Sequence, residues 1–189
     1  MKIIFFGSDN FAVPSLKALL TTTHKVSCVV TQPDKQKGRG LHLEATAIKI
    51  AAKDAGLEIY QPKTVNENEV IKFLKSLNPD IFIVISYGQI LSQEILSIPR
   101  IFAINAHASM LPKYRGAAPI NWAVIRGEKT TGITIMKMTK NMDAGPIIIQ
   151  EEIEIKDLDT VITLEDKLSE KASELLINSL NLIENKIYY

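Results

Sequence analysis

The sequence predicts an α/β protein whose doubly wound, mostly parallel sheet carries helices on both faces. Short runs of apolar and β-branched residues alternate with helical patterns along the chain, which is typical of repeated βαβ units. The run at 81–85 is apolar at every position, as expected of a central strand that is covered on both faces. With 189 residues, 46% of them hydrophobic and 23% charged, the chain suits one globular domain and not a disordered segment.

The first half of the chain predicts strands separated by helices. Strands are expected at 2–6, 24–31, 58–60 and 81–85. Helices are expected after residue 10, at 48–55 and at 66–77. The first helix should present Val13, Leu16 and Leu20 on one apolar face. The third should begin with a capping box formed by Asn66 and Glu69.

The second half continues with fewer helices. Strands are expected at 101–106, 131–138 and 147–155. A short helix at 119–125 is closed by Gly127, and a last helix from about Thr163 carries its leucines on one stripe. Residues 34–40, between the second strand and the second helix, form a glycine-containing basic loop. Because no repeat or linker interrupts the chain, residues 1–189 are interpreted as one domain.

Charge and cysteine content limit the classes of function. The 22 Lys and Arg and 21 Asp and Glu leave a formal net charge of +1, so affinity for a polyanion must be local. The single cysteine, Cys28, lies in an apolar run and fits a reduced compartment. Apolar stretches fall short of the ~18 residues of a membrane span. We therefore expect a soluble, cytoplasmic monomer that does not bind a membrane.

Common cofactor motifs are missing from the sequence. The first turn, which starts at Gly7, lacks the further glycines of the dinucleotide fingerprint, which disfavours NAD or FAD. The three histidines and one cysteine do not have the spacing of a zinc site, so no metal is predicted.

The strongest candidate chemistry lies at the end of the strand expected at 101–106. Asn105 and His107 are two residues apart, so a strand would present an amide and an imidazole on the same face. An amide can stabilise an oxyanion, and an imidazole can move a proton near neutral pH. Taken alone, an Asn and a His at a strand end more often only hydrogen-bond a loop, so the pair by itself is weak evidence of a catalytic site.

A carboxylate and a second basic loop extend this candidate site. Asp143 lies in a turn between two strands, where an Asp usually makes only a local turn. If the turn packs over the strand end, Asp143 would orient His107 and stabilise its charged form. Residues 109–119 follow His107 directly, carry two cations, and are expected to shape the entry to a site.

At this point the motifs become recognisable as a set. The strings NAHASMLP at 105–112, RGAAPI at 115–120 and MDAG at 142–145 resemble the folate-dependent formyltransferase family. Further strings, at 7–14, 31–34 and 38–40, resemble the branch of that family that acts on methionyl initiator tRNA. This resemblance covers essentially the whole chain and implies a Rossmann-like formyltransferase domain.

The resemblance implies transfer of a formyl group from 10-formyltetrahydrofolate to the amino group of methionyl initiator tRNA, in translation initiation. Asn105 matches the oxyanion-stabilising amide, His107 the proton-handling imidazole and Asp143 its carboxylate partner. Folate contacts are implied at Tyr87, Gly88, Gln89, Ile90, Leu91, Ser109, Leu111, Pro112, Asn141 and Met142. Acceptor contacts are implied at Phe11, Lys37, Arg39, Arg115 and Gly116.

Some positions depart from the family's pattern. Met110 replaces the first leucine of an SLLP tetrad, a swap that nearly conserves volume. The loop at 35–44 is shorter than in members whose insertion there helps to hold the acceptor stem. We also expect residues 1–189 to be the catalytic domain without the family's C-terminal tRNA-binding β-barrel.

Other readings of the same motifs stay open. Phosphoribosylglycinamide formyltransferase shares the Asn, His and Asp set, although its glycine-rich phosphate-binding first turn is missing here. Amino-sugar N-formyltransferases have the same core. A folate-binding or RNA-binding module without catalysis is the alternative from a different class, because fold alone does not establish activity.

Overall fold

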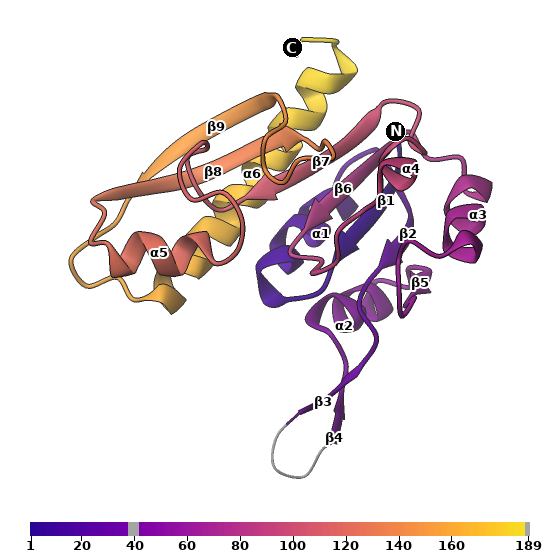
Figure 1. Cartoon of the computed structure of the whole chain (residues 1–189), viewed down its shortest axis with the longest axis horizontal. Coiled ribbons are helices and arrows are strands. Elements are labelled where there is room, and N and C mark those ends of the chain that lie inside the picture. Colours follow the sequence, from indigo (N-terminus) through magenta and orange to yellow (C-terminus); the bar gives the residue numbers. More distant parts are fainter. Residues whose placement is uncertain (38–41, 188–189) are drawn as a thin grey trace. The chain divides into compact units, whose positions relative to one another are not determined.

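A computed structural model describes residues 1–37 and 42–187 (Figure 1). The chain divides into two compact units, Met1–Ala103 and Ile104–Tyr189, and each is described by itself.

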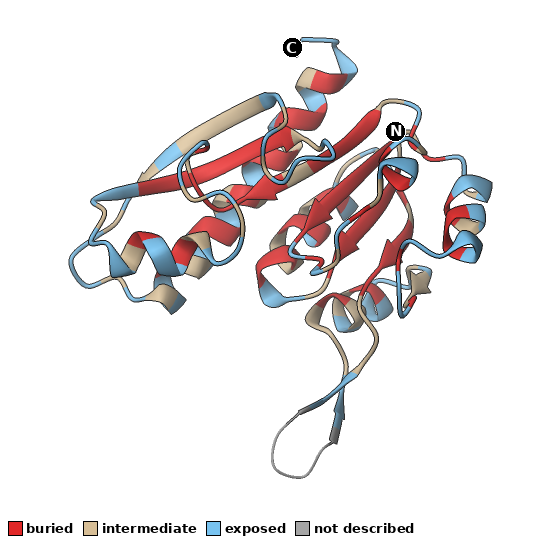
Figure 2. Cartoon of the chain, in the orientation of Figure 1, coloured by how far each residue is buried: buried red, intermediate tan, exposed pale blue. Residues whose placement is uncertain are grey.

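The first unit contains parallel strands in the order β5-β2-β1-β6. Their bounds are β1 Lys2–Gly7, β2 Lys25–Val30, β5 Ile59–Tyr60 and β6 Ile81–Ile85. The helical segments are η1 Asn10–Ala12, α1 Val13–Leu20, α2 Ala47–Asp54, α3 Asn68–Ser76 and α4 Gln93–Leu96. Every residue of β6 is buried (Figure 2), as its uninterrupted apolar sequence predicts.

A small hairpin that was expected to be an irregular loop follows β2. Its strands, β3 Lys35–Lys37 and β4 His42–Glu44, pair antiparallel in a two-stranded sheet of their own. The hairpin is fastened where it meets the rest of the unit, because Lys49 and Gln61 both bond the Asp34 carboxylate, at 2.6 and 2.8 Å.

Two local predictions for the first unit are wrong. In α1 the buried leucines are Leu16 and Leu19, whereas Leu20 is exposed, so the apolar face is rotated by one position. At α3 no capping box forms, because the Asn66 side chain bonds the Ile90 carbonyl and the Ser92 amide instead. The Asn66 side chain is therefore used in tertiary hydrogen bonds and not, as the sequence pattern predicts, in capping the start of α3.

The second unit is an antiparallel sheet with two helices. Its elements are β7 Phe102–His107, which begins just before the unit boundary, α5 Pro119–Ile125, β8 Thr130–Lys137, β9 Ile147–Glu154 and α6 Val161–Glu184. Strand β8 pairs with both β7 and β9, antiparallel in each case. The doubly wound pattern of the sequence did not predict this antiparallel part, because β8 and β9 are joined by a turn and not by a helix.

Helix α6 covers β8 and β9 with the leucine stripe that the sequence predicts. Leu164, Leu168, Leu175, Leu176, Leu180 and Ile183 are all buried. The helix begins with a capping box in which the side chains of Thr160 and Thr163 bond each other's backbone amides.

The single cysteine is a buried core residue, as expected. Burial, with a smaller contribution from the charge of Glu58, raises the pKa of the Cys28 thiol to about 12. In the described residues, no helix is long and apolar enough to cross a membrane.

Candidate catalytic site

The candidate site in the second unit is built on the end of β7. Asn105 is partly exposed, whereas His107 is buried, with 7% of its surface accessible. In the register with β8, Asn105 lies opposite Met136 and His107 opposite Thr134. Among the described residues, the Asn105 side chain has no hydrogen-bond partner, so both of its N–H donors are available to a ligand.

Asp143 lies beside His107, as the motifs predict. Its Oδ2 atom is 3.6 Å from Nδ1 of His107, and both side chains are largely buried. The backbone N–H of Gly116 donates to the same oxygen at 2.8 Å. The carboxylate is therefore fixed by one hydrogen bond while it faces the imidazole at ion-pair distance.

The turn that carries Asp143 depends on an unusual backbone. Asp143 has a φ of 47°, and a side chain on Gly145 would place its Cβ only 1.8 Å from the Lys137 carbonyl oxygen. Glycine is the residue type that permits this close approach. The turn between β8 and β9 is thereby held tightly enough to direct the carboxylate at His107.

The second nitrogen of His107 is also held. Nε2 lies 2.9 Å from the Tyr114 carbonyl oxygen, in the loop that follows β7. Tyr114, Gly116 and Ala118 all have positive φ values, which turn this loop back toward the strand end. Since a carbonyl only accepts, Nε2 carries the hydrogen of this bond, a tautomer assigned from geometry.

The same loop is fastened at its outer side. The Tyr114 hydroxyl donates to Glu128 at 2.5 Å. This hydrogen bond is the main cause of a raised pKa at Tyr114 and of a lowered pKa at Glu128. Arg126 lies over the rings of Tyr114 and Trp122.

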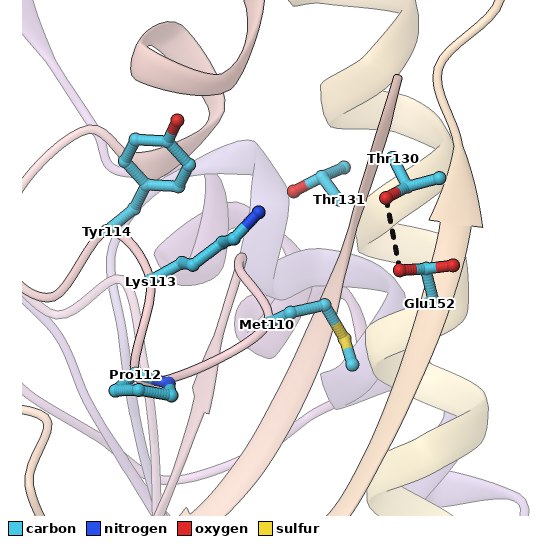
Figure 3. Close-up of a pocket in the computed structure, with 7 residues that line it drawn as sticks. All are labelled: Met110, Pro112, Lys113, Tyr114, Thr130, Thr131 and Glu152. Atoms are coloured by element: carbon cyan, nitrogen blue, oxygen red, sulfur yellow. Dashed lines mark hydrogen bonds between the residues drawn. The ribbon is translucent and has the colours of Figure 1, made fainter. Parts of the chain in front are cut away.

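A cavity of about 220 Å³ opens beside this loop (Figure 3). It is lined by Met110, Pro112, Lys113, Tyr114, Thr130, Thr131 and Glu152. Gly132 admits the Met110 side chain to this side of β8, because a Cβ at Gly132 would lie 2.5 Å from the Met110 sulfur. The thioether thus fits against a strand position that has no side chain.

The folate residues expected in the first unit are held mainly through their carbonyl groups. The Tyr87 carbonyl accepts from Ser8 and Gln32, both at 3.0 Å. The side chains of Tyr87 and Leu91 lie in the core, and burial is the main cause of a raised pKa at Tyr87. Ile90, in contrast, is 71% exposed.

Gly88 and Gln89 complete this segment. Gly88 has a φ of 83°, and a Cβ there would lie 2.8 Å from the Gln32 amide nitrogen. Gln89 accepts from the Val65 backbone and donates to the Lys63 carbonyl. The exposed backbone of Gly88 and the exposed side chain of Ile90 are therefore parts of this segment that have surface for a ligand.

The remaining expected folate residues lie in the second unit. Ser109 and Leu111 are buried, whereas Pro112, Asn141 and Met142 are exposed. The Ser109 hydroxyl donates to the Lys113 carbonyl at 2.6 Å, so it closes the loop on itself.

The residues expected to contact the acceptor differ in how accessible they are. Phe11 lies in the core of the first unit, so its side chain offers little surface to an acceptor. The Gly116 amide is occupied by Asp143, which gives Gly116 an internal role, whereas Arg115 is exposed. Lys37 belongs to β3, and Arg39 lies outside the described residues.

The sequence did not single out the Tyr114 carbonyl, the internal role of Gly116, or the pair formed by buried Thr134 and partly buried Gln150, which bonds the loop. Only the pairing of the strands could have pointed to Thr134, because Thr134 lies opposite His107 when β7 and β8 pair antiparallel. Within residues 1–37 and 42–187, no cluster of His, Cys, Asp and Glu could hold a metal ion.

A family model described as formyl transferase matches residues 1–180. The chain belongs to this family. It is 53% identical over 185 residues to a methionyl-tRNA formyltransferase of Thermodesulfovibrio yellowstonii, covering 98% of this chain and 60% of that protein. It is 49% identical over 189 residues to one of Clostridium tetani, covering 99% of this chain and 61% of that protein. The chain thus spans about 60% of the length of these relatives.

Solved structures of the formyl transferase family confirm the fold. A phosphoribosylglycinamide formyltransferase of Anaplasma phagocytophilum matches with a TM-score of 0.78 at 21% identity, covering 98% of this chain and 87% of that one. A glycinamide ribonucleotide transformylase of Symbiobacterium toebii matches with a TM-score of 0.80 at 19% identity, covering 98% and 88%. The α/β fold expected from the sequence is therefore confirmed.

Proposed function

We propose that this formyl transferase domain moves a formyl group from 10-formyltetrahydrofolate to the amino group of methionyl initiator tRNA. The observation that carries the proposal is the contact between His107 and Asp143, at the end of the strand that presents the Asn105 amide, which bonds no other side chain or backbone group that the structure describes. The 53% identity to a protein named methionyl-tRNA formyltransferase supports this acceptor over the others.

The reaction needs no covalent bond to the protein. The amine nitrogen attacks the formyl carbon, the carbonyl oxygen becomes an oxyanion, and N10 of the folate leaves with the carbon–nitrogen electron pair. The amine loses one proton, and the leaving nitrogen gains one. Asn105 donates to the developing oxyanion, and His107 supports it once protonated, through the Nδ1–H and the positive charge of the ring.

The geometry favours Nδ1 of His107 as the atom that exchanges the proton. Nε2 is occupied by the Tyr114 carbonyl, so Nδ1 has the free lone pair in the neutral ring. When Nδ1 takes a proton, the ring becomes a cation that faces Asp143. The carboxylate thus stabilises the protonated ring, which then returns the proton to the leaving nitrogen.

The donor is proposed to meet backbone groups of 87–91 together with Ser109, Leu111, Pro112, Asn141 and Met142. In each unit taken by itself, one exposed apolar side chain supports this role, because Ile90 in the first and Met142 in the second each offer apolar surface to a ligand.

The acceptor is proposed to meet the cations Lys37, Arg39 and Arg115, each able to pair with a phosphate. In this proposal, residues 1–189 act as a monomeric catalytic domain in the cytoplasm, where initiator tRNA is charged. A net charge of +1 provides little long-range attraction, so capture of the acceptor depends on these local cations.

The decisive experiment offers three acceptors in parallel to the 189-residue chain with 10-formyltetrahydrofolate. These are methionyl initiator tRNA, glycinamide ribonucleotide and an amino-sugar nucleotide, and mass spectrometry identifies the formylated product. We expect formyl-methionyl-tRNA as the main product. Preferential formylation of another acceptor would reassign the substrate, and folate binding without any product would support a non-catalytic binding module.

A further inference from the structure

Three polar residues form a row across the sheet of the second unit. His107 on β7 is paired with Thr134 on β8, and Thr134 is paired with Gln150 on β9. Directly paired residues of an antiparallel sheet have side chains on the same face. The candidate catalytic imidazole therefore shares its face of the sheet with a hydroxyl and an amide that the proposed reaction does not use.

The hydroxyl of Thr134 is fully buried, and its hydrogen-bonding capacity is completely used. It donates to the Ser109 carbonyl at 2.7 Å and accepts from the Leu111 amide at 3.1 Å and from Gln150 Nε2 at 2.8 Å. One hydroxyl has one donor and two acceptor lone pairs. Thr134 thus bonds two backbone groups of the loop after β7, the Ser109 carbonyl and the Leu111 amide, and one side chain of β9, that of Gln150.

Gln150 completes this attachment. Its Nε2 atom donates to the Leu111 carbonyl at 2.9 Å as well as to Thr134. Both amide hydrogens are therefore used: one bonds the loop directly, and the other bonds the Thr134 hydroxyl that holds the loop. A carboxylate at this position would have no hydrogen to give and would face two oxygen atoms.

The attachment continues through the loop to His107. The Ser109 hydroxyl donates to the Lys113 carbonyl at 2.6 Å, and the Lys113 amide donates to the Met110 carbonyl at 3.0 Å. Lys113 directly precedes Tyr114, whose carbonyl accepts from Nε2 of His107 at 2.9 Å. The position of that carbonyl, and with it the tautomer of the imidazole, depends on where 109–113 is held.

We propose that Thr134 and Gln150 are positioning residues for His107. They fix the 109–114 loop so that the Tyr114 carbonyl keeps the hydrogen on Nε2 and leaves Nδ1 toward Asp143. Their catalytic consequence rests on the proposed function, whereas their effect on the imidazole does not. Neither side chain is required to touch a substrate.

The test compares four variants of the 189-residue chain. Thr134→Val keeps the shape and removes the hydroxyl, whereas Thr134→Ser keeps the hydroxyl. Gln150→Glu keeps the length and removes the donors. Glu154→Gln is the control, because it exchanges a carboxylate and an amide at an exposed position of the same strand, β9.

Two readouts are needed. We expect Thr134→Val and Gln150→Glu to lower kcat on the order of 10- to 100-fold while KM for each substrate changes much less, since a misplaced group affects the reaction more than binding. Thr134→Ser and Glu154→Gln should stay close to the wild type. Long-range ¹H–¹⁵N NMR of the His107 ring, assigned with His107→Gln, should show hydrogen on Nε2 in the wild type and a mixed tautomer in the two impaired variants.

The readouts separate failure of this inference from failure of the proposed function. An unchanged ring spectrum in folded Thr134→Val and Gln150→Glu would overturn the positioning role, whatever the activity. A wild type inactive with every acceptor would overturn the proposed function, and the ring spectrum would still decide the positioning role. If Thr134→Val does not fold, the ring spectrum of Gln150→Glu decides the positioning role alone, because Gln150 lies on the partly exposed strand β9.

Discussion

The loop at 108–118 and the β3–β4 hairpin both follow the carboxyl end of a strand, and the sequence marks both as basic. The loop is attached by a buried hydrogen bond from Thr134 and by partly buried hydrogen bonds from Ser109 and Gln150. The hairpin strands pair only with each other, and the attachments described for it lie at its base, around Asp34. The amino-acid composition of the loop and the hairpin does not distinguish them, whereas the hydrogen-bond partners of the loop do.

This difference in attachment corresponds to two different functional requirements. A loop that orients an imidazole must hold atoms to fractions of an ångström, because small displacements cost much of the rate. A cationic hairpin that meets a polyanion acts through charge, which depends weakly on position. A substitution in either region is therefore expected to affect the chemistry, the stability of the fold or only the binding of charge.

The largest effect is expected at the end of β7. Asn105→Ala removes the proposed oxyanion donor and should lower turnover by roughly 100-fold or more, while folate binding survives. Single-turnover formylation and folate titration would measure the two quantities. Asn121→Ala, an exposed amide on α5, is the control and should leave both unchanged. Near-wild-type activity of both Asn105→Ala and His107→Ala would refute the site.

The next effect concerns stability. Ser109→Ala removes a fully buried hydroxyl that bonds the Lys113 carbonyl, and should lower the free energy of unfolding by about 1 kcal/mol. Urea unfolding would measure it. Ser173→Ala removes a similar bond, to the Glu170 carbonyl, at an exposed site and should stay within about 0.5 kcal/mol.

The hairpin should respond differently to the same measurement. Gln36→Ala, at an exposed position of β3, should also change the unfolding free energy by no more than about 0.5 kcal/mol. A larger loss for Gln36→Ala than for Ser109→Ala would reverse the comparison between hairpin and loop.

The sequence predicted most of the fold because β6 and the α6 stripe depend on hydrophobic periodicity, which is local. The resemblance of its motifs to the formyltransferase family also implied that Asp143 lies near His107. The hairpin, the antiparallel pairing of β8 and the role of Gly116 could not be predicted in this way. Each depends on which distant backbone group a short polar segment meets, and periodicity carries no information about that.

A smaller effect is expected from the hairpin cations. Replacing Lys37 and Arg39 together by Ala should weaken tRNA binding and lower the slope of log K against log salt by up to about 2, with folate affinity unchanged. Binding measured at several salt concentrations gives the slope. Lys17→Ala with Lys72→Ala, two exposed helix lysines of the same unit, is the control. An unchanged slope would remove the hairpin from the acceptor site.

The smallest effects should come from the carboxylates that fasten each region. Hydrogen bonds from Gln61 and Lys49 lower the pKa of Asp34 at the hairpin, and the bond from Tyr114 lowers that of Glu128 at the loop. A folded-state pKa below the unfolded value, about 3.9 for Asp and 4.3 for Glu, stabilises the fold above that value, and the gain is lost as the pH falls through the folded pKa.

Asp34→Asn and Glu128→Gln should therefore each lower the urea midpoint slightly at pH 6, and the difference from the wild type should shrink toward pH 3. Both effects should be small because solvent screens these groups. Added salt should reduce both effects, since Lys49 lies 2.6 Å from Asp34 and Lys113 lies 3.6 Å from Glu128. A difference that grows toward acid would mean that these carboxylates are bound mainly in their protonated forms, and the hydrogen-bond directions assigned to both regions would be wrong.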